Sequence, residues 1–295
     1  MCGIVGLFLK NDSLQPKLGE LLSGMLITLT DRGPDSAGLA VYGPDVDGVK
    51  LTVQADRPET AFADLEMSLT AALDHPVTVR VVDTHAVITL PARCECAARM
   101  FVTANGMRVM GAGQRIEIFK EVGLPKDVVQ RFGTRAIAGT HGIGHTRMAT
   151  ESAVTTLGAH PFSTGLDQCL VHNGSLSNHN RLGRALAKKG FGPETGNDTE
   201  VAACYLSWRL AEGADLGTAL EGALEDLDGF FTFVVGTKTG FGVVRDPIAC
   251  KPAVMAETDD YVAFGSEYRA LADLPAIEAA RVWEPEPATV YFWER

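Results

Sequence analysis

The chain has 295 residues, of which 46% are hydrophobic, and carries a formal net charge of −11, so it can bury a large core as one big domain or two smaller ones. The negative charge excludes a general binder of nucleic-acid backbones, because such binders depend on clustered Lys and Arg. No apolar run approaches the ~20 residues that span a bilayer, and the cysteines follow no disulfide rhythm, so we expect a cytoplasmic protein without a membrane segment.

The first predicted element is an apolar strand that follows Met1-Cys2-Gly3. Removal of Met1 would make Cys2 the N-terminal residue, carrying both a thiol and a free α-amine. An α-amine with a pKa of ~7.7–8.0 can accept the proton of a thiol whose pKa is ~8.5. Gly3 lets a substrate approach the thiol closely, and residues 4–8 supply the side chains of a buried strand. These residues predict a nucleophile; the alternative is a small buried cysteine at the end of an edge strand.

Leucine and methionine recur at helical spacing over residues 14–30, which predicts an amphipathic helix packed on a sheet. The helix ends at the charged loop Arg32-Gly33-Pro34-Asp35-Ser36. Residues 37–42 and 50–54 then predict two strands. A charged loop between buried elements suggests a functional role for Arg32, although this residue would also suit the capping of the last helical carbonyls.

Residues 57–138 predict a small α+β insert without a chemical motif. A short helix over 62–73 and a second over 125–132 flank predicted strands, which lie at 77–82, 86–90, 107–110 and 115–119, the last two joined around Gly111-Ala112-Gly113. Cys94 and Cys96 resemble half of a metal site. Because no second pair and no histidine cluster accompany them, we predict a structural role for this pair and no bound metal.

Residue patterns that suggest a catalytic or binding role occur again between residues 142 and 175. A strand of small residues ends at Arg147, and an apolar strand runs into Asn173-Gly174. A side-chain amide and a flexible backbone N–H suit a developing oxyanion, whereas Asn-Gly is also a common hairpin turn. A helix follows over 178–189, and Asn197-Asp198-Thr199-Glu200 opens another, with Asp198 or Thr199 as its expected N-cap.

The last third predicts one helix and then mostly strands. The helix covers 216–227, the strands lie at 229–235, 241–245, 253–256, 261–264 and 288–293, and a short helix starts at 265. Strands come in neighbouring pairs and helices gather between the groups. This pattern predicts an α+β fold with antiparallel sheets and argues against a Rossmann alternation.

Taken together, eight short segments resemble the class II glutamine amidotransferases, which are N-terminal nucleophile hydrolases. They follow the family's order over residues 1–56 and 139–271: Met-Cys-Gly-Ile at 1–4, Arg-Gly-Pro-Asp-Ser at 32–36, Gly-Ile-Gly-His-Thr-Arg at 142–147, His-Pro-Phe at 160–162, His-Asn-Gly at 172–174, Asn-Asp-Thr-Glu at 197–200, Arg-Asp-Pro at 245–247 with Lys-Pro at 251–252, and Gly-Ser-Glu at 265–267. The resemblance implies a four-layer αββα sandwich. We expect one amidotransferase domain over 1–295 with an α+β insert at about 57–138.

The resemblance also implies the reaction, which is hydrolysis of the glutamine side-chain amide through a thioester on Cys2. The α-amine of Cys2 would carry the proton to the leaving ammonia. The Asn173 side chain and the Gly174 N–H would hold the oxyanion. Arg32 and Gly3 would support Cys2, with Arg32 bracing the loop above it.

For the substrate, the resemblance places Arg147 at the α-carboxylate and Asp198 at the α-ammonium, a charge pairing that selects a free amino acid. Thr150 and His172 would also belong to the substrate site. Some family members have a histidine where this chain has Glu151, so one contact to the substrate is missing here.

The long insert before Arg147 and the lack of a following synthase domain resemble the separate amidotransferase subunit of glutamate-synthase-like or N-methylglutamate synthase complexes. This implies synthase subunits that accept ammonia and carry flavin and iron–sulfur groups, and no cofactor in this chain. Two alternatives stand beside this prediction. An amidase for another amide would leave Arg147 and Asp198 unpaired, which is costly in a closed site. A non-catalytic partner subunit predicts lesions at Cys2, Asn173 or Gly174, and all three residues are intact.

Overall fold

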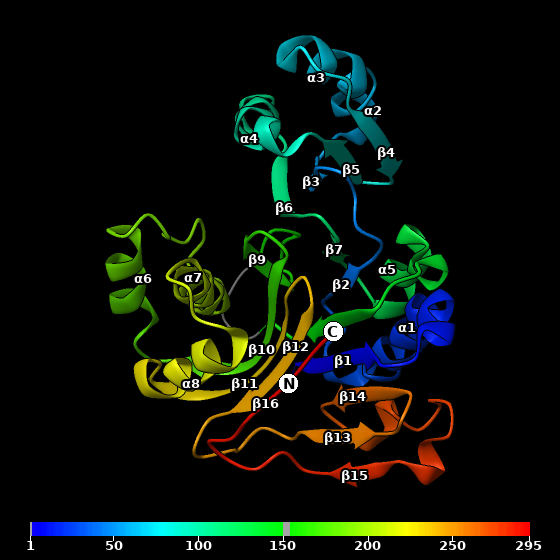
Figure 1. Ribbon diagram of the computed structural model, residues 1–295, viewed down its shortest axis with the longest axis vertical. Helices are drawn as coiled ribbons and strands as arrows, with labels where there is room; N and C mark the ends of the chain where they lie inside the picture. The colour runs from blue at the N-terminus through cyan, green and yellow to red at the C-terminus, as the bar shows by residue number, and fades with distance from the viewer. Residues whose placement is uncertain (1, 150–153) are drawn as a thin grey trace.

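In the computed structural model, which describes residues 2–149 and 154–295, two antiparallel sheets pack face to face (Figure 1). The first sheet has the order β15 (Arg281–Trp283), β13 (Val254–Glu257), β14 (Tyr261–Gly265), β1 (Gly3–Leu9), β8 (His141–Arg147), β2 (Ser36–Tyr42), β7 (Ile116–Val122). The second has the order β16 (Val290–Glu294), β12 (Gly240–Arg245), β11 (Gly229–Gly236), β10 (Gln168–Leu176), β9 (Phe162–Gly165). The N-terminal strand therefore lies inside its sheet, between β14 and β8.

Side-chain alternation along β1 explains its central place. Ile4 and Phe8 belong to the buried cluster between the two sheets, where they meet Val171, Val234 and Phe241. The odd-numbered residues of the strand face the other way, into the cluster beneath the helices. A strand with apolar residues on both faces is stable only where both faces are covered, which is the position that β1 has.

Helices cover the outer faces of both sheets, and the four layers confirm the expected αββα sandwich. On the seven-stranded sheet lie α1 (Leu18–Thr28) and α5 (Pro125–Phe132). On the five-stranded sheet lie α6 (His179–Ala187), α7 (Asp198–Ala211) and α8 (Leu216–Asp226). The helix expected from residue 14 begins later, because a 3₁₀ segment containing Pro16 precedes α1. Short 3₁₀ segments occur at Asp12–Lys17, Thr30–Arg32, Ala92–Cys94, Thr134–Ala136, Tyr268–Ala270 and Ile277–Ala279.

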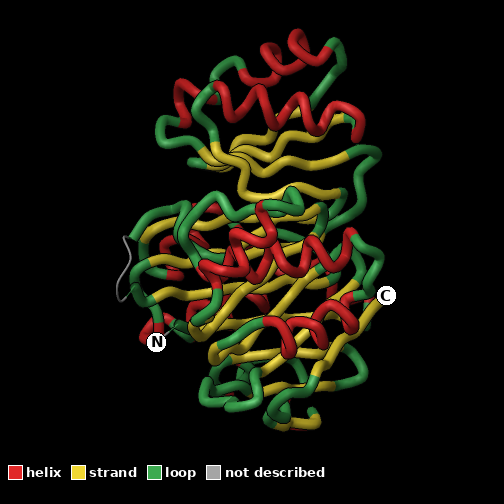
Figure 2. Tube along the Cα trace, turned by 90° about the vertical axis from the view of Figure 1, so that its left-hand side faces the viewer, coloured by secondary structure: helices red, strands yellow, loops and turns green. Residues whose placement is uncertain are grey.

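A third sheet with its own helices projects from this sandwich (Figure 2). Its strand order is β4 (Thr78–Val82), β5 (His85–Leu90), β3 (Val49–Gln54), β6 (Arg108–Gly113), and it carries α2 (Pro58–Ala61), α3 (Leu65–Leu73) and α4 (Glu95–Ala104). These elements bury a separate apolar cluster, which includes Leu51, Leu69 and Ile88. We call residues 49–113 the projecting lobe.

The projecting lobe differs from the insert expected at about 57–138. It begins earlier, since β3 pairs with β5 and β6, and it ends earlier, since β7 pairs with β2 and α5 packs on the main core. The strands expected to pair around Gly111-Ala112-Gly113 therefore lie in different sheets. Tyr42 and Ile116 are opposite each other in the β2–β7 pair, so the chain leaves and re-enters the sandwich between neighbouring strands. Alternation identifies a strand but not its partner, which is why the sequence misplaced this boundary.

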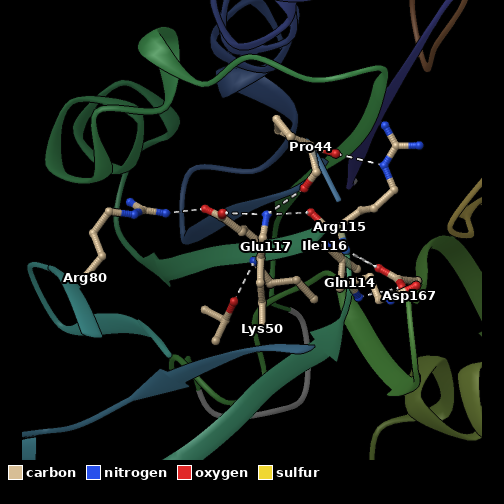
Figure 3. Close-up of polar contacts among 11 residues, drawn as sticks. Pro44, Lys50, Arg80, Gln114, Arg115, Ile116, Glu117 and Asp167 are labelled. Atoms are coloured by element: carbon tan, nitrogen blue, oxygen red, sulfur yellow. Dashed lines mark hydrogen bonds and ion pairs between the residues drawn. The ribbon is translucent and has the colours of Figure 1, made fainter. Parts of the chain in front are cut away.

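Polar contacts fix the base of the projecting lobe (Figure 3). The Asp167 carboxylate accepts backbone N–H groups of Gln114, Arg115 and Ile116 at 2.7–3.0 Å. The Lys50 Nζ atom lies 3.2 Å from the Glu117 carboxylate, which also pairs with Arg80 of the lobe. Lys50 and Glu117 are well buried, so this connection is weakly screened by solvent.

The sequence missed the short strands β9 and β15 and the helix α4, which begins at the Cys94–Cys96 segment. Within residues 2–149 and 154–295, no helix combines the length and apolar character needed to cross a membrane.

Candidate active site

The residue at the start of β1, Cys2, is half-buried and its thiol is free. Gly3 is opposite Thr146 of β8 in the sheet register, so continuing that register by one residue brings Cys2 beside Arg147. A Cβ on Gly3 would lie 2.8 Å from Thr146 Oγ1 and 3.0 Å from Leu29. The absence of a side chain at Gly3 therefore lets β1 pack closely against β8 where Cys2 emerges.

The backbone around Cys2 is held by the Arg-Gly-Pro-Asp-Ser and Gly-Ser-Glu segments. Arg32 Nε donates to the Cys2 carbonyl oxygen at 3.0 Å, and Arg32 Nη1 donates to Glu267 Oε1 at 2.6 Å. Ser266 Oγ accepts the backbone N–H of Ile4, two residues after Cys2, at 2.9 Å. The Arg32 hydrogen bond holds the pKa of the Glu267 carboxyl below its usual value, so this carboxylate stays ionised opposite Arg32. Arg32 thus reaches across to Cys2 and is not limited to capping its own helix.

Asn173 and Gly174 approach Cys2 from the other sheet. Asn173 Nδ2 donates to the Cys2 carbonyl oxygen at 3.3 Å. Both residues lie inside β10 and pair with Thr232 and Phe231 of β11, so Asn-Gly is not a hairpin turn here. Gly174 has φ +154°, and a Cβ on it would lie 2.0 Å from the Phe230 carbonyl oxygen. This backbone conformation and the close approach of the Phe230 carbonyl therefore require glycine at position 174.

Asp198 lies at the start of α7, next to the end of β10. Its Oδ2 atom accepts the Leu176 N–H at 2.9 Å, and its side chain is 23% exposed. The N-cap of α7 is Asn197, whose side chain accepts the Thr199 N–H at 2.9 Å, so the expectation that Asp198 or Thr199 caps this helix was wrong. The carboxylate of Asp198 is thus not engaged in capping and is partly open to solvent.

Arg147 ends β8 and is 6% exposed. The loop from Gly33 to Ser36 packs on this strand end: the Asp35 N–H donates to the Arg147 carbonyl at 3.0 Å, and Asp35 Oδ2 accepts the Ala149 N–H at 2.7 Å. The Arg-Gly-Pro-Asp-Ser segment thereby holds the backbone on which Arg147 lies. The predicted substrate residue Thr150, and Glu151 beside it, lie outside the described residues.

His172 points away from Cys2. Successive strand residues face opposite sides, and while Asn173 reaches Cys2, the His172 ring packs edge-on against Phe233, with centroids 5.0 Å apart. Its Nδ1 atom lies 3.0 Å from Thr199 Oγ1. Burial lowers the pKa of His172 to about 4, with Asp198 acting in the opposite direction, so the ring is neutral at pH 7. His172 is therefore close to the candidate site but buried behind it.

The other cysteines lie away from this arrangement. Cys94, Cys169 and Cys204 are buried, and Cys96 and Cys250 are exposed. Across residues 2–149 and 154–295, no group of three or more His, Cys, Asp or Glu side chains is arranged to hold a metal ion.

The fold thus brings Cys2, Arg32 and Asn173 into direct contact, with Arg147 and Asp198 on the adjoining strand and helix ends. A half-buried thiol on a residue whose carbonyl accepts from a side-chain amide suits nucleophilic attack on a carbonyl carbon. The sequence had given Glu267 only as part of a motif and Thr199 only as a possible cap. Glu267 contacts Arg32, and Thr199 contacts His160 and His172. Each of these contacts joins segments that are far apart in the chain.

Comparison with known proteins agrees with this geometry. Residues 145–273 match the family model described as a glutamine amidotransferase domain. "Glutamine amidotransferase-like protein GlxB" of Rhizobium meliloti (strain 1021) is 68% identical over 297 residues, covering 100% of this chain and 98% of that protein. The chain belongs to the glutamine amidotransferase family.

A second relative of this amidotransferase, a "Putative glutamine amidotransferase" of Methanothermobacter thermautotrophicus, is 32% identical and is covered over its whole length. Among solved structures, the glutamine phosphoribosylpyrophosphate amidotransferase of B. subtilis has a TM-score of 0.64 at 19% identity, covering 99% of this chain and 47% of that one. That similarity shows the fold. The protein is therefore a class II glutamine amidotransferase with the N-terminal nucleophile hydrolase fold, and an enzyme of that class.

Proposed function

We propose that this amidotransferase hydrolyses the side-chain amide of L-glutamine through a thioester on Cys2 and passes the ammonia to a partner synthase. The observation that carries the proposal is the Cys2 carbonyl, which is held by Arg32 from one side and by Asn173 of the opposite sheet. Both contacts fix the backbone of the very residue whose thiol would attack. A merely structural cysteine at a strand end requires no such arrangement.

In this mechanism Met1 is removed and the α-amine of Cys2 accepts the thiol proton. The sulfur attacks the amide carbon, the amine returns the proton to the leaving ammonia, and water then cleaves the thioester to glutamate. The Asn173 amide and the Gly174 N–H stabilise the oxyanion formed in both steps. Each such donor contributes about 3–4 kcal/mol in a transition state.

Recognition of glutamine rests on charges at opposite ends of the amino acid. Arg147 would bind the α-carboxylate and Asp198 the α-ammonium, with Thr150 in the same substrate site. Two features support this assignment: the register that brings Arg147 beside Cys2, and the partial exposure of the Asp198 carboxylate next to β10. An amide substrate lacking the free amino and carboxyl groups would leave both charges unpaired.

The ammonia acceptor belongs, in this proposal, to separate synthase subunits of a glutamate-synthase-like or N-methylglutamate synthase complex, which hold the flavin and iron–sulfur groups. Hydrolysis without an acceptor would consume glutamine without synthesis. The projecting lobe suits a docking role because it has its own core and exposes Met67 and Met100, which are 68% and 69% accessible. We therefore expect the isolated protein to be a poor glutaminase that its partner stimulates.

The test combines N-terminal mass spectrometry with glutamate release from glutamine, measured with and without candidate partners. Active protein should lack Met1, Cys2→Ala should abolish release, and the exposed-cysteine controls Cys96→Ala and Cys250→Ala should retain it. Circular dichroism should show that Cys2→Ala stays folded, since it removes one half-buried sulfur. Substantial turnover by Cys2→Ala, or full activity of protein that retains Met1, would refute the mechanism.

A further inference from the structure

A buried polar cluster lies between β8, β10 and the start of α7. Its members are three histidines and one threonine: His145, His160, His172 and Thr199. Thr199 Oγ1 lies 2.8 Å from His160 Nε2 and 3.0 Å from His172 Nδ1. His145 Nε2 lies 3.1 Å from the His172 carbonyl oxygen, and the His145 and His160 rings stack with centroids 4.0 Å apart. The cluster therefore joins four segments: β8, the segment before β9 that carries His160, β10 and α7.

The hydrogen positions follow from the partners. A carbonyl oxygen can only accept, so His145 carries its hydrogen on Nε2. Within the described part of the chain, the remaining ring nitrogens, Nδ1 of His145, Nδ1 of His160 and Nε2 of His172, are buried without a hydrogen-bond partner. An orphaned N–H costs more than an orphaned lone pair, so these three atoms are assigned as lone pairs. Both His160 and His172 then donate to the Thr199 hydroxyl oxygen.

This assignment leaves the Thr199 hydroxyl hydrogen free to donate, and Asp198 Oδ1 lies 3.5 Å away. It requires neutral rings, each with a single N–H. Burial supplies that condition, because it lowers the pKa of His145 to about 3, that of His172 to about 4, and that of His160 well below its usual value. The hydrogen bonds of His160 and His172 therefore run in one direction, through the Thr199 hydroxyl to the Asp198 carboxylate, while His145 donates to the His172 carbonyl.

Three of the four members of the cluster are close chain neighbours of a proposed active-site residue. Thr199 follows Asp198, His172 precedes Asn173, and His145 lies two residues before Arg147. The Leu176 N–H holds Oδ2 of Asp198 at 2.9 Å and the Thr199 hydroxyl approaches Oδ1 at 3.5 Å, so both carboxylate oxygens have a partner. The same hydroxyl ties that carboxylate to the strand that carries Asn173.

We propose that Thr199 is a positioning residue for glutamine hydrolysis: its hydroxyl, held by His160 and His172, orients the Asp198 carboxylate and couples it to the strand bearing Asn173. This inference deepens the proposed function and rests on it. It gives His172 a role behind the site, as a donor to Thr199, in place of a contact with glutamine. Hydrolysis then depends on a residue that does not touch the substrate.

The test compares Thr199→Val, which keeps the side-chain shape without the hydroxyl, with Thr199→Ser, which keeps the hydroxyl. Ser207→Ala is the matched control, because Ser207 is a buried hydroxyl on the same helix, bonded to Thr164 Oγ1 and Gln168 Oε1 at 2.8 and 3.1 Å. Both deletions should lower stability. Only Thr199→Val should also lower kcat/KM for glutamine, by about tenfold and mainly through KM, as expected for a lost hydrogen bond to a charged group.

Two further readouts separate positioning from structural damage. Alkylation of Cys2 by iodoacetamide, which needs no glutamine site, should proceed at the wild-type rate in Thr199→Val. In an Asp198→Asn background, Thr199→Val should change kcat/KM by less than about twofold, because the two residues act through one carboxylate.

The outcomes are distinct. Recovery of activity in Thr199→Ser, with loss confined to Thr199→Val, would support the role. Equal effects of Thr199→Val and Ser207→Ala on kcat/KM in an active enzyme would overturn this inference alone. Absence of glutamate release by the wild type, even with candidate partners present, would overturn the proposed function and this inference with it.

Discussion

Replacing Asp198 by Asn separates a substrate-binding role from a structural one. The change removes the negative charge but keeps an oxygen that can accept the Leu176 N–H, now bonded at 2.9 Å. The cap of α7 also survives, because Asn197 provides it. The structure loses a carboxylate in the first helical turn, which is worth about 0.3–1 kcal/mol through the helix dipole. It also loses the second oxygen, which the Thr199 hydroxyl approaches at 3.5 Å.

The expected loss of activity is larger. Asp198 is 23% exposed in the free protein, and a bound α-ammonium would cover it further. Loss of a hydrogen-bonded charge pair costs on the order of 2–3 kcal/mol, which corresponds to a fall of about 30- to 150-fold in kcat/KM. The loss should be seen mainly in KM, since the charge is present equally in the ground state and the transition state.

The assay is steady-state glutamate release across a glutamine series, together with urea unfolding of the same variants. Asp215→Asn is the matched control: Asp215 caps α8 through the Thr218 N–H at 2.7 Å, and asparagine caps about as well as aspartate. We expect that control to change neither kcat/KM nor stability appreciably. Equal losses of stability and activity in Asp198→Asn, or no loss of activity, would return Asp198 to a purely structural role.

Three other outcomes follow from the same contacts. Gly174→Ala should destabilise the protein by about 2 kcal/mol or more, measured by urea unfolding, because its Cβ would meet the Phe230 carbonyl at 2.0 Å; wild-type stability would contradict the strand geometry. Stability should fall as pH drops from about 6.5 to about 4, because histidines of the unfolded chain take up protons in this range. Four buried rings of the folded chain stay neutral there, since burial lowers their pKa values to about 3 or 4: His85, His141, His145 and His172. Each ring contributes a slope of up to about 1.4 kcal/mol per pH unit, so unfolding free energies that stay constant from pH 7 to pH 5 would refute the neutral assignment. Met67→Glu with Met100→Glu should abolish partner stimulation while leaving basal glutaminase activity unchanged, and unaltered stimulation would remove the docking role from the projecting lobe.

Much of the fold could be predicted from local patterns. Runs of apolar or small residues identified β1, β2 and β8, and helical spacing identified α1 and α7. The resemblance carried by the motifs implied the αββα layers. The candidate nucleophile was also accessible, because a cysteine after the initiator methionine offers both thiol and amine on one residue. Each of these features depends on the residues of one segment, so it can be predicted without knowing which other segments pack against it.

Strand pairing and side-chain direction were decided only by the tertiary structure. Alternation does not record which strands pair, so β3 and β7 were assigned to the wrong side of the lobe boundary. Asn173-Gly174 has the composition of a turn, yet both residues pair with β11 in an extended strand, where Gly174 has a positive φ.

The site shows the same division. The sequence nominated Cys2 and Asn173 as candidates from their chemistry, and Asp198 from the resemblance to the family. It did not supply the contacts that orient them: Arg32 on the Cys2 carbonyl and Thr199 beside Asp198, held by two histidines. Such hydrogen bonds depend on distances of about 3 Å between segments that the sheets bring together, and no local pattern encodes those distances.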